Sequence, residues 1–328
     1  MSSNTITPPT LLITGCNGQL GFELQRRLAN LGRVVARDHA ACDLTQPEAL
    51  RKALREVRPD VIVNAAGYTN VDQAETDVEQ AFAVNAVAPG ILAEEAKAIG
   101  SLLVHYSTDY VFDGGKSAAY VEVDPANPLS VYGHSKLAGE AAIAESGAQA
   151  LVLRTAWVAG AHGANFAKTI LQLGRKRDCL HVIADRIGVP TTAELVADVT
   201  ADLLVRYWML ADRQTFPSGL YHLAATGQTS WHGYAVEILT YARARGVLLQ
   251  ATPEQIVPIL ATDYPEAALR PANSCLDTSK LQRTFGIALP GWEVGVRRLL
   301  DQLFLEQGAM CNQYASANTQ AITYPGCP

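Results

Sequence analysis

Residues 11–21, LLITGCNGQLG, place an apolar strand directly before a loop that contains three glycines. Apolar positions at helical spacing follow, so the spacing Gly15-x-x-Gly18-x-x-Gly21 predicts a strand, a tight turn and a helix. Glycine is needed in such a turn because the backbone must bend sharply, approach a pyrophosphate closely and let the helix pack on the strand. The helix N-terminus supplies free N–H groups for the phosphates. The stretch therefore predicts a dinucleotide-binding unit at the start of the chain.

Strands and helices continue to alternate through the first half of the chain. Pro89 falls inside one of the helical patterns and is a point at which that helix can be interrupted. Parallel strands joined by right-handed helical crossovers form a sheet with both faces covered, so the pattern predicts an α/β protein with a doubly wound, Rossmann-like sheet. The expected strands lie at 34–36, 60–65, 102–106 and 151–154, and the expected helices at 47–57, at 74–96 and from 132 onward.

The pattern loosens after residue 160, which divides the chain into three parts. We expect an NAD(P)-binding Rossmann domain at 10–160, a smaller region at 161–307 that mainly binds substrate and partly returns to the sheet, and a loosely attached tail at 308–328. The tail is polar and rich in small residues, with no period. The middle region holds helical patterns at 165–174, 193–209 and 230–245 and proline-bearing loops at 252–258 and 264–271.

Composition excludes several classes of protein. The 328 residues are 48% apolar and 18% charged, which is typical of a globular chain rather than a disordered one. A formal net charge of −6 gives no bulk positive field for nucleic acid or an anionic membrane. The N-terminus lacks the features of a secretory signal, and no apolar run reaches membrane-spanning length, so we expect a cytoplasmic protein. Six cysteines without a Cys-x-x-Cys pair argue against a zinc site and a disulfide framework.

Several residues after the predicted strands are placed to line a dinucleotide. Asp38 follows the second strand, where an acid bonds the adenosine ribose hydroxyls. Arg37 beside it is suited to a 2′-phosphate instead, so NADH and NADPH both stay open. Asp43 and Leu44 are placed to flank the adenine, and the small residues at 64–67 suit a backbone that passes close to the middle of the cofactor.

Tyr132 and Lys136 are spaced i, i+4 and so lie on one face of a predicted helix. A free tyrosine, with a pKa of about 10, is a poor acid–base group at neutral pH, whereas a neighbouring ammonium lowers that pKa. Upstream, the stretch 107–109 (Ser-Thr-Asp) ends a predicted strand and places a hydroxyl at the crevice of the sheet. The histidines, His105 and His134 among them, show no metal-ligand spacing, and we assign none of them a metal or a proton-transfer role.

The glycine loop together with Tyr132-x-x-x-Lys136 resembles the extended short-chain dehydrogenase/reductase superfamily. The resemblance covers roughly residues 11 to 304 and is closest to the sugar-nucleotide ketoreductases of that superfamily. The motifs that narrow it are Gly18-Gln19-Leu20-Gly21, Asn64-Ala65-Ala66, Val71-Asp72-x-Ala74-Glu75, His105 to Phe112, Arg154-Thr155-x-Trp157, Asn165 to Thr169, and Arg270-Pro271-x-Asn273-Ser274-x-Leu276-Asp277.

The resemblance implies hydride transfer from NADPH or NADH to the C4 ketone of a dTDP-6-deoxy-4-hexulose, a substrate class used for cell-surface polysaccharide. Tyr132 would then protonate the developing alkoxide, Lys136 would lower the pKa of that tyrosine and hold the nicotinamide ribose, and Thr108 would bond the same sugar oxygen. Substrate contacts are expected from Thr108, Asp109, Trp157 and Arg270, the last because a guanidinium matches phosphate oxygens in pairs. Lys168 is a second candidate cation. Cofactor contacts are expected from Gly15, Gly18, Gln19, Leu20, Gly21, Asp38, Asp43, Leu44, Ala65, Ala66, Gly67, Tyr106, Tyr132 and Lys136.

Other activities remain open at this point. Dehydratases of the superfamily carry Asp-Glu after the threonine, whereas Tyr110 follows Asp109 here, which disfavours elimination. A ketoreductase of other stereochemistry, an epimerase and a non-catalytic dinucleotide-binding regulatory subunit are the alternatives.

A homodimer is possible. The resemblance implies that such a dimer forms around Mg²⁺ held by acidic side chains. Glu23 and Glu194 match two of those acids, but Gln302 stands where the third is expected, which argues against metal dependence.

Overall fold

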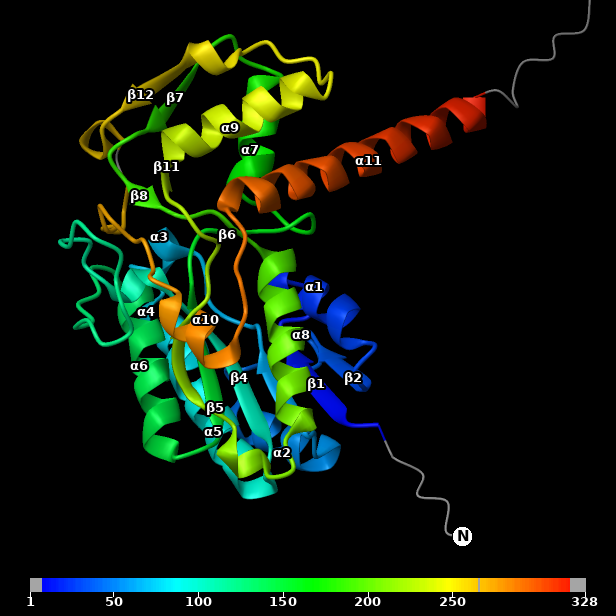
Figure 1. The fold of residues 1–328 in the computed structure, drawn as a ribbon, viewed down its shortest axis with the longest axis vertical. Coiled ribbons are helices and arrows are strands. Elements are labelled where there is room, and N and C mark those ends of the chain that lie inside the picture. Colours follow the sequence, from blue (N-terminus) through cyan, green and yellow to red (C-terminus); the bar gives the residue numbers. More distant parts are fainter. Residues whose placement is uncertain (1–7, 265, 319–328) are drawn as a thin grey trace, which may run out of the picture.

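A six-stranded parallel sheet forms the centre of the larger lobe (Figure 1). The computed structural model describes residues 8–264 and 266–318. The strand order is β10-β5-β4-β3-β1-β2. The chain adds β2 on one side of β1 and the later strands on the other, so the order of addition reverses between β1 and β3, as in a doubly wound sheet. The strands are β1 (Thr10–Thr14), β2 (Arg33–Arg37), β3 (Val61–Asn64), β4 (Leu102–Thr108), β5 (Ala150–Thr155) and β10 (Gly219–His222).

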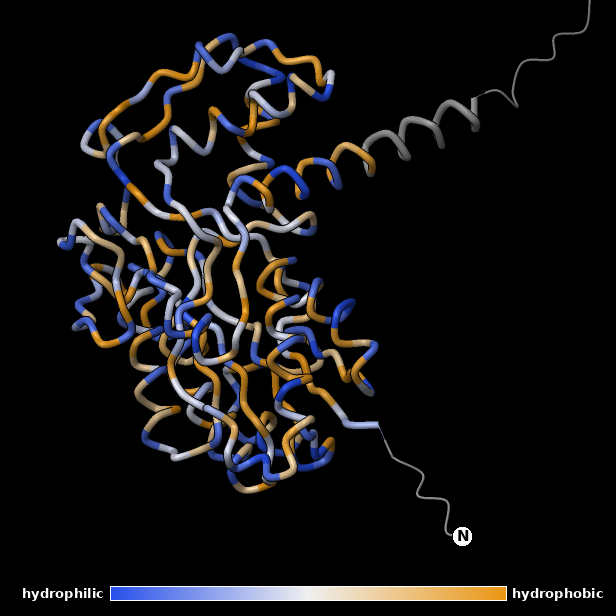
Figure 2. The backbone as a smooth tube through the Cα atoms, viewed as in Figure 1, coloured by the Kyte–Doolittle hydropathy of each residue, from blue (hydrophilic) through white to orange (hydrophobic). Residues whose placement is uncertain are grey.

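Helices cover both faces of this sheet. On one face pack α1 (Gln19–Leu28), α8 (Ala193–Met209) and α10 (Ser279–Phe285), and on the other α2 (Pro47–Val57), α5 (Ala88–Ile99) and α6 (Val131–Ser146). All residues of β3 and β4 are buried, because apolar side chains on both faces of a parallel strand need cover. The hydropathy colouring of Figure 2 shows the same apolar strands crossing the centre of the lobe. The predicted fold class is confirmed.

A smaller lobe packs above the carboxyl ends of the strands around its own apolar cluster (Figure 1). Its helices are α7 (Phe166–Gly174), α9 (Trp231–Ala244) and α11 (Trp292–Asn318). Two-stranded sheets join β7 (Leu180–Ile183) to β12 (Ile256–Ile259), β8 (Ile187–Gly188) to β11 (Thr229–Ser230) and β6 (Val158–Ala159) to β9 (Thr191–Thr192). Two short 3₁₀ turns, η4 (Pro253–Gln255) and η5 (Ala261–Asp263), flank β12. Two others follow elements of the larger lobe: η2 (Asp109–Val111) follows β4 and η3 (Arg213–Thr215) follows α8.

The helix expected at 74–96 has a different form. A first turn, α3 (Val71–Ala74), is separate, and α4 (Val78–Phe82) continues through the π-helical turn η1 (Ala83–Val87) into α5. Pro89 therefore does not break the helix. It lies at the start of α5, where a missing N–H is tolerated, and the wider π turn lies directly before it.

Two further expectations differ from the structure. The proline-bearing stretch 252–258 was expected as a loop, but it contains η4 and most of β12. Pro258 is tolerated because β12 belongs to a sheet of only two strands and has a free edge. Helix α11 continues past residue 307 to Asn318, so regular structure does not end at the expected boundary of the tail, whose residues 319–328 lie outside the described chain.

None of the described helices has the length and apolarity that crossing a membrane requires.

Candidate active site

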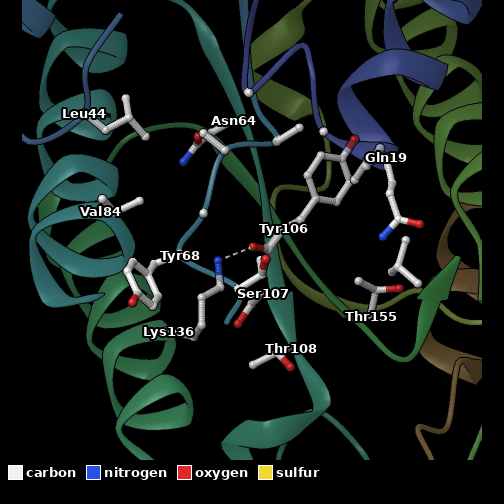
Figure 3. Close-up of a pocket in the computed structure, with 18 of the residues that line it drawn as sticks. Gln19, Leu44, Asn64, Tyr68, Val84, Tyr106, Ser107, Thr108, Lys136 and Thr155 are labelled. Carbon is white, nitrogen blue, oxygen red and sulfur yellow. Dashed lines mark hydrogen bonds between the residues drawn. The ribbon is translucent and has the colours of Figure 1, made fainter. Parts of the chain in front are cut away.

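A cavity of about 830 Å³ opens at the carboxyl ends of the sheet strands, where the strand order reverses. Figure 3 shows side chains from β4, α1 and α6 converging on it. Most of the predicted site residues line this cavity: Gly15, Gly18, Gln19, Leu20, Asp38, Leu44, Ala65, Ala66, Gly67, Tyr106, Thr108, Asp109, Tyr132, Lys136 and Trp157. Gly21, Asp43 and Arg270 are not among the lining residues.

The glycine loop is built by close backbone contacts. Gly15 has a φ of +67°, and a Cβ there would lie 2.6 Å from the Ala66 Cα. A Cβ on Gly21 would lie 2.1 Å from the Gly15 carbonyl oxygen, so Gly21 serves the packing of α1 and does not face the cavity. Gly18 begins α1 without a side-chain cap. The first N–H groups of α1 are therefore not taken by a cap and fit an anion such as a dinucleotide diphosphate.

Asp38 presents a fixed carboxylate at the end of β2. Its Oδ1 accepts from the Ala41 N–H at 2.9 Å, and its Oδ2 accepts from the Asn17 amide at 3.2 Å. This placement fits an acid that bonds ribose hydroxyls. Asp43 instead accepts hydrogen bonds from Thr45, which lower the pKa of its carboxyl and tie it into the turn before α2.

Tyr132 and Lys136 lie on α6. Ser130 caps the start of this helix, because its side-chain hydroxyl accepts a hydrogen bond from the Gly133 N–H. Burial raises the pKa of Tyr132 to about 12, and a hydrogen bond with Thr108 acts in the opposite direction. Burial lowers the pKa of Lys136 to about 8, against the effect of Glu140. We expected the ammonium of Lys136 to lower the pKa of Tyr132, but the pKa is raised, mainly by burial and to a smaller extent by the charge of Asp109.

The Lys136 amine is held by the main chain of β4. Its Nζ donates to the Tyr106 carbonyl oxygen at 2.6 Å, the contact drawn as a dashed line in Figure 3. It also lies 3.4 Å from the Nε2 of His105, a fully buried side chain. The amine is thus fixed on the cavity side of the sheet.

Asp109 is a buried carboxyl beside the threonine. Its Oδ1 accepts from the Thr108 Oγ1 at 3.0 Å, and its Oδ2 has no partner among the described residues. Burial raises the pKa of Asp109 to about 7, against hydrogen bonds from Ser274 and Thr108. Ser274 belongs to the motif that begins at Arg270, so this late segment of the chain contributes to the environment of the acid.

Trp157 has a backbone φ of +43°, which is unusual for a residue other than glycine. Its indole stacks on Trp231 of α9 with ring centroids 3.7 Å apart and planes 10° from parallel. Gly188 leaves room for it, since a Cβ there would lie 2.5 Å from the ring. The strained backbone and the stacked partner together fix the indole at the cavity wall.

The two predicted cations are engaged elsewhere. Arg270 makes a paired contact with Asp72, at 3.1 and 2.7 Å, and a further one with Glu266 at 3.2 Å. Lys168 donates to the carbonyl oxygens of Ala161 and Gly163 and so closes the loop before α7. Neither residue is among those that line the cavity.

Sequence reasoning missed several lining residues. Tyr68 and Thr69 lie in the loop after β3, which the side chain of Asn85 holds through the main chain of Tyr68 at 2.9 Å on both its N–H and its carbonyl. Their position after a strand was the available signal. Asn64 and Ser107, which belong to the expected stretches 64–67 and 107–109, also line the cavity. The other unanticipated residues on the wall are Asn17, His39, Cys42, Gln80, Val84, Thr155, Val158 and Ala164.

The acids considered for Mg²⁺ are engaged in ion pairs. Glu23 pairs with Arg26 at 3.0 Å, and Glu194 pairs with Arg27 at 2.7 Å. Among the residues whose side chains the structure describes, 8–264 and 266–305, no group of three or more His, Cys, Asp or Glu is arranged to hold a metal.

Comparison with known proteins shows the family to which this chain belongs. Residues 9–305 match the model of the RmlD substrate binding domain. A dTDP-4-dehydrorhamnose reductase of Burkholderia thailandensis is 48% identical over 89% of this chain and 99% of its own, and one of Escherichia coli K12 is 45% identical over 90% and 98%. The crystal structure of a Bacillus anthracis dTDP-4-dehydrorhamnose reductase in complex with NADP is 33% identical, with a TM-score of 0.80 over 90% of this chain and 100% of that one. A Thermus thermophilus UDP-glucose 4-epimerase complexed with NAD, 21% identical with a TM-score of 0.71, shares the fold.

The doubly wound sheet, the glycine loop and the Tyr–Lys pair in one cavity define an extended short-chain dehydrogenase/reductase. Within that class, the chain belongs to the RmlD family, the family of the dTDP-4-dehydrorhamnose reductases.

Proposed function

We propose that this chain reduces the C4 ketone of dTDP-4-dehydro-β-L-rhamnose to dTDP-L-rhamnose with NADPH or NADH, a step that serves cell-surface polysaccharide. The observation that carries the proposal is the convergence of Thr108, Tyr132 and Lys136 on one wall of the cavity that the glycine loop also lines. Relatives 45–48% identical over nearly their full length carry the name of this reductase.

The residues present fit a nicotinamide dinucleotide. The uncapped start of α1 suits the diphosphate, the Asp38 carboxylate suits a ribose, and the amine of Lys136 suits the ribose next to the nicotinamide. When bound, NAD(P)H supplies the hydride. The protein has to hold the ketone and deliver a proton to its oxygen.

Tyr132 is the proton donor in this proposal. A reductase needs a protonated phenol at the start of each turnover, and the burial that raises the pKa of Tyr132 to about 12 keeps the proton in place at neutral pH. The ammonium of Lys136 stabilises the phenolate that remains after proton transfer. Thr108, which hydrogen-bonds Tyr132 and Asp109, orients the ketone oxygen toward the phenol.

Trp157 and Asp109, which line the same cavity, are assigned to the sugar nucleotide. Trp157 presents a fixed indole, and Asp109, beside Thr108, offers a buried carboxyl with one oxygen free of protein partners among the described residues. Arg270 was expected to bind the diphosphate of the substrate, but in the structure its guanidinium is occupied by Asp72 and Glu266. We therefore assign Arg270 to the connection between the lobes.

The test is NAD(P)H oxidation with the dTDP-4-keto-6-deoxy-L-sugar, generated in situ by the two preceding enzymes, with the product sugar identified by NMR. Tyr132→Phe is expected to lower kcat by at least ~10²-fold, since general acid catalysis contributes about that much. Tyr110→Phe is a matched control, because Tyr110 packs edge-on against Tyr132 with centroids 5.9 Å apart but does not line the cavity. Absence of oxidation with either cofactor contradicts the proposal and favours an epimerase or a regulatory subunit, and a product epimeric at C4 identifies a ketoreductase of other stereochemistry.

A further inference from the structure

A chain of buried side chains leads from the first strand of the sheet to the catalytic lysine. Thr14, Asn64 and His105 come from β1, β3 and β4, and each is at most 1% exposed. The Thr14 hydroxyl lies 2.6 Å from Asn64 Oδ1, Asn64 Nδ2 lies 2.9 Å from His105 Nδ1, and His105 Nε2 lies 3.4 Å from Lys136 Nζ. The proposed reaction gives no role to Thr14, Asn64 or His105.

The charge of His105 is fixed by its surroundings. Burial, with a smaller effect from the charge of Lys136, lowers the pKa of this imidazole well below its usual value. The ring is therefore neutral at neutral pH, and it has one nitrogen that donates and one that accepts. Nε2 is the nitrogen that faces Lys136, and the orientation of the Asn64 amide decides whether it accepts or donates a hydrogen bond.

Two arrangements of the chain satisfy its hydrogen bonds. With the Asn64 NH₂ toward the ring, Nδ1 accepts, Nε2 carries the proton, and Nε2–H faces a neutral amine. With the amide turned over, its oxygen accepts from Nδ1–H, and Nε2 is free to accept from an ammonium. The chain can therefore match either charge state of Lys136.

We propose that His105 is a positioning residue that holds the Lys136 amine and, by accepting a hydrogen bond through Nε2, stabilises its charged form. The proposal deepens the proposed function, since the ammonium is the form that supports Tyr132. It assigns to His105 a role that the sequence analysis did not.

Other charged and titratable groups around Lys136 set the background for this effect. Tyr106 of β4 supplies only its carbonyl oxygen to the amine, while Tyr132 and Glu140 come from α6 itself. Glu140 raises the pKa of Lys136 but is paired with Arg154 of β5 at 2.6 Å. Asp109 of η2 acts on Tyr132 rather than on the lysine. His105 is thus the neutral neighbour whose replacement changes a hydrogen bond without changing a charge.

The test compares His105→Gln with His105→Asn. A glutamine amide reaches the position of the ring Nε2 and keeps a polar atom toward Lys136, whereas an asparagine amide reaches only the position of Nδ1 and keeps the contact with Asn64. Lysine labelled with ¹³C at Cε reports the titration of Lys136 by NMR, with its signal assigned from Lys136→Met. The readout uses the protein without substrate and so does not depend on whether the proposed reaction is correct.

We expect Lys136 to titrate near the wild-type pH in His105→Gln and about one unit lower in His105→Asn, a roughly tenfold loss of proton affinity. In the turnover assay, the alkaline limb of the kcat profile should move to lower pH by the same amount in His105→Asn alone. Equal titration of Lys136 in both variants and the wild type, or a higher pKa in His105→Asn, would overturn the proposal. If His105→Asn does not fold, Thr14→Val replaces it. The Thr14 hydroxyl donates to Asn64 Oδ1 and so holds the NH₂ toward the ring, and its loss frees the amide to turn over, which should raise the pKa of Lys136. A titration unchanged from wild type is again the contrary result.

Discussion

At the scale of the residue, the site depends on burial more than on pairs of opposite charge. Burial raises the pKa of both Tyr132 and Asp109 and lowers that of Lys136. A phenol that keeps its proton is what a reduction requires, and an ammonium that is only weakly favoured is sensitive to a single neighbouring acceptor. Burial disfavours the charged form of all three, and Asp109 differs from Tyr132 because its pKa of about 7 makes that charged form common at mildly alkaline pH.

Asp109→Asn tests that last point through stability. The pKa of Asp109 in the folded protein, about 7, lies above its ordinary value of 3.8, so its contribution to stability is complete below pH 3.8 and is lost as pH rises through 7. We expect Asp109→Asn to raise the free energy of unfolding at pH 8 by roughly 2–4 kcal/mol and to leave it nearly unchanged at pH 4, measured by urea denaturation. Asp113→Asn should instead lower the free energy of unfolding at pH 8, because hydrogen bonds from Gly115, Asn127 and Tyr120 lower the pKa of Asp113. Equal effects of Asp109→Asn at both pH values would refute this account.

At the scale of the element, the helix that carries Tyr132 and Lys136 is placed by a close backbone contact. A Cβ on Gly139 of α6 would lie 2.1 Å from the carbonyl oxygen of Asn85 in the π turn η1. The same residue, Asn85, holds Tyr68 and bonds the Ser135 hydroxyl at 3.0 Å through its side chain. One glycine therefore sets the distance between α6 and the loop that closes the cavity beside it.

Gly139→Ala is expected to lower the free energy of unfolding by more than ~2 kcal/mol, because a main-chain oxygen cannot move aside as a flexible side chain does. Gly90→Ala, also inside a helix of the α5–α6 interface, meets only the Ala142 Cβ at 3.2 Å and should be close to neutral. Thermal and urea unfolding of the two variants give the comparison. A Gly139→Ala protein as stable as Gly90→Ala would show that α6 can shift away from η1 at little cost.

At the scale of the whole molecule, the segment around Arg270 ties the smaller lobe to α3 of the larger one. If Arg270 serves this connection, Arg270→Met and Asp72→Asn should raise KM for the sugar nucleotide by similar factors, and the double variant should add little to either. If Arg270 instead binds the substrate diphosphate, Asp72→Asn should release the guanidinium and lower KM, while Arg270→Met raises it. Steady-state kinetics of the three variants with NAD(P)H saturating distinguish the two roles.

The sequence was sufficient for the fold and for most of the cavity wall, because both follow from local patterns. A glycine turn, buried strands and an i, i+4 pair each specify their own geometry, and the ends of parallel strands meet at one edge of the sheet. The engagement of Arg270 with Asp72 was not predictable, since the partners lie far apart in the chain and compete with any ligand for the same guanidinium. The π turn before Pro89 was missed because a proline in a helical pattern usually marks a break.

The hydrogen bond from Lys136 to the Tyr106 carbonyl has a consequence for how this site can vary. A main-chain oxygen is present whatever side chain stands at position 106, so substitution there leaves the acceptor in place. Substitutions at His105 can therefore change the pKa of the Lys136 amine while its hydrogen bond to the Tyr106 carbonyl oxygen persists. Selection or engineering can therefore adjust the pH range in which the enzyme works without moving the catalytic lysine.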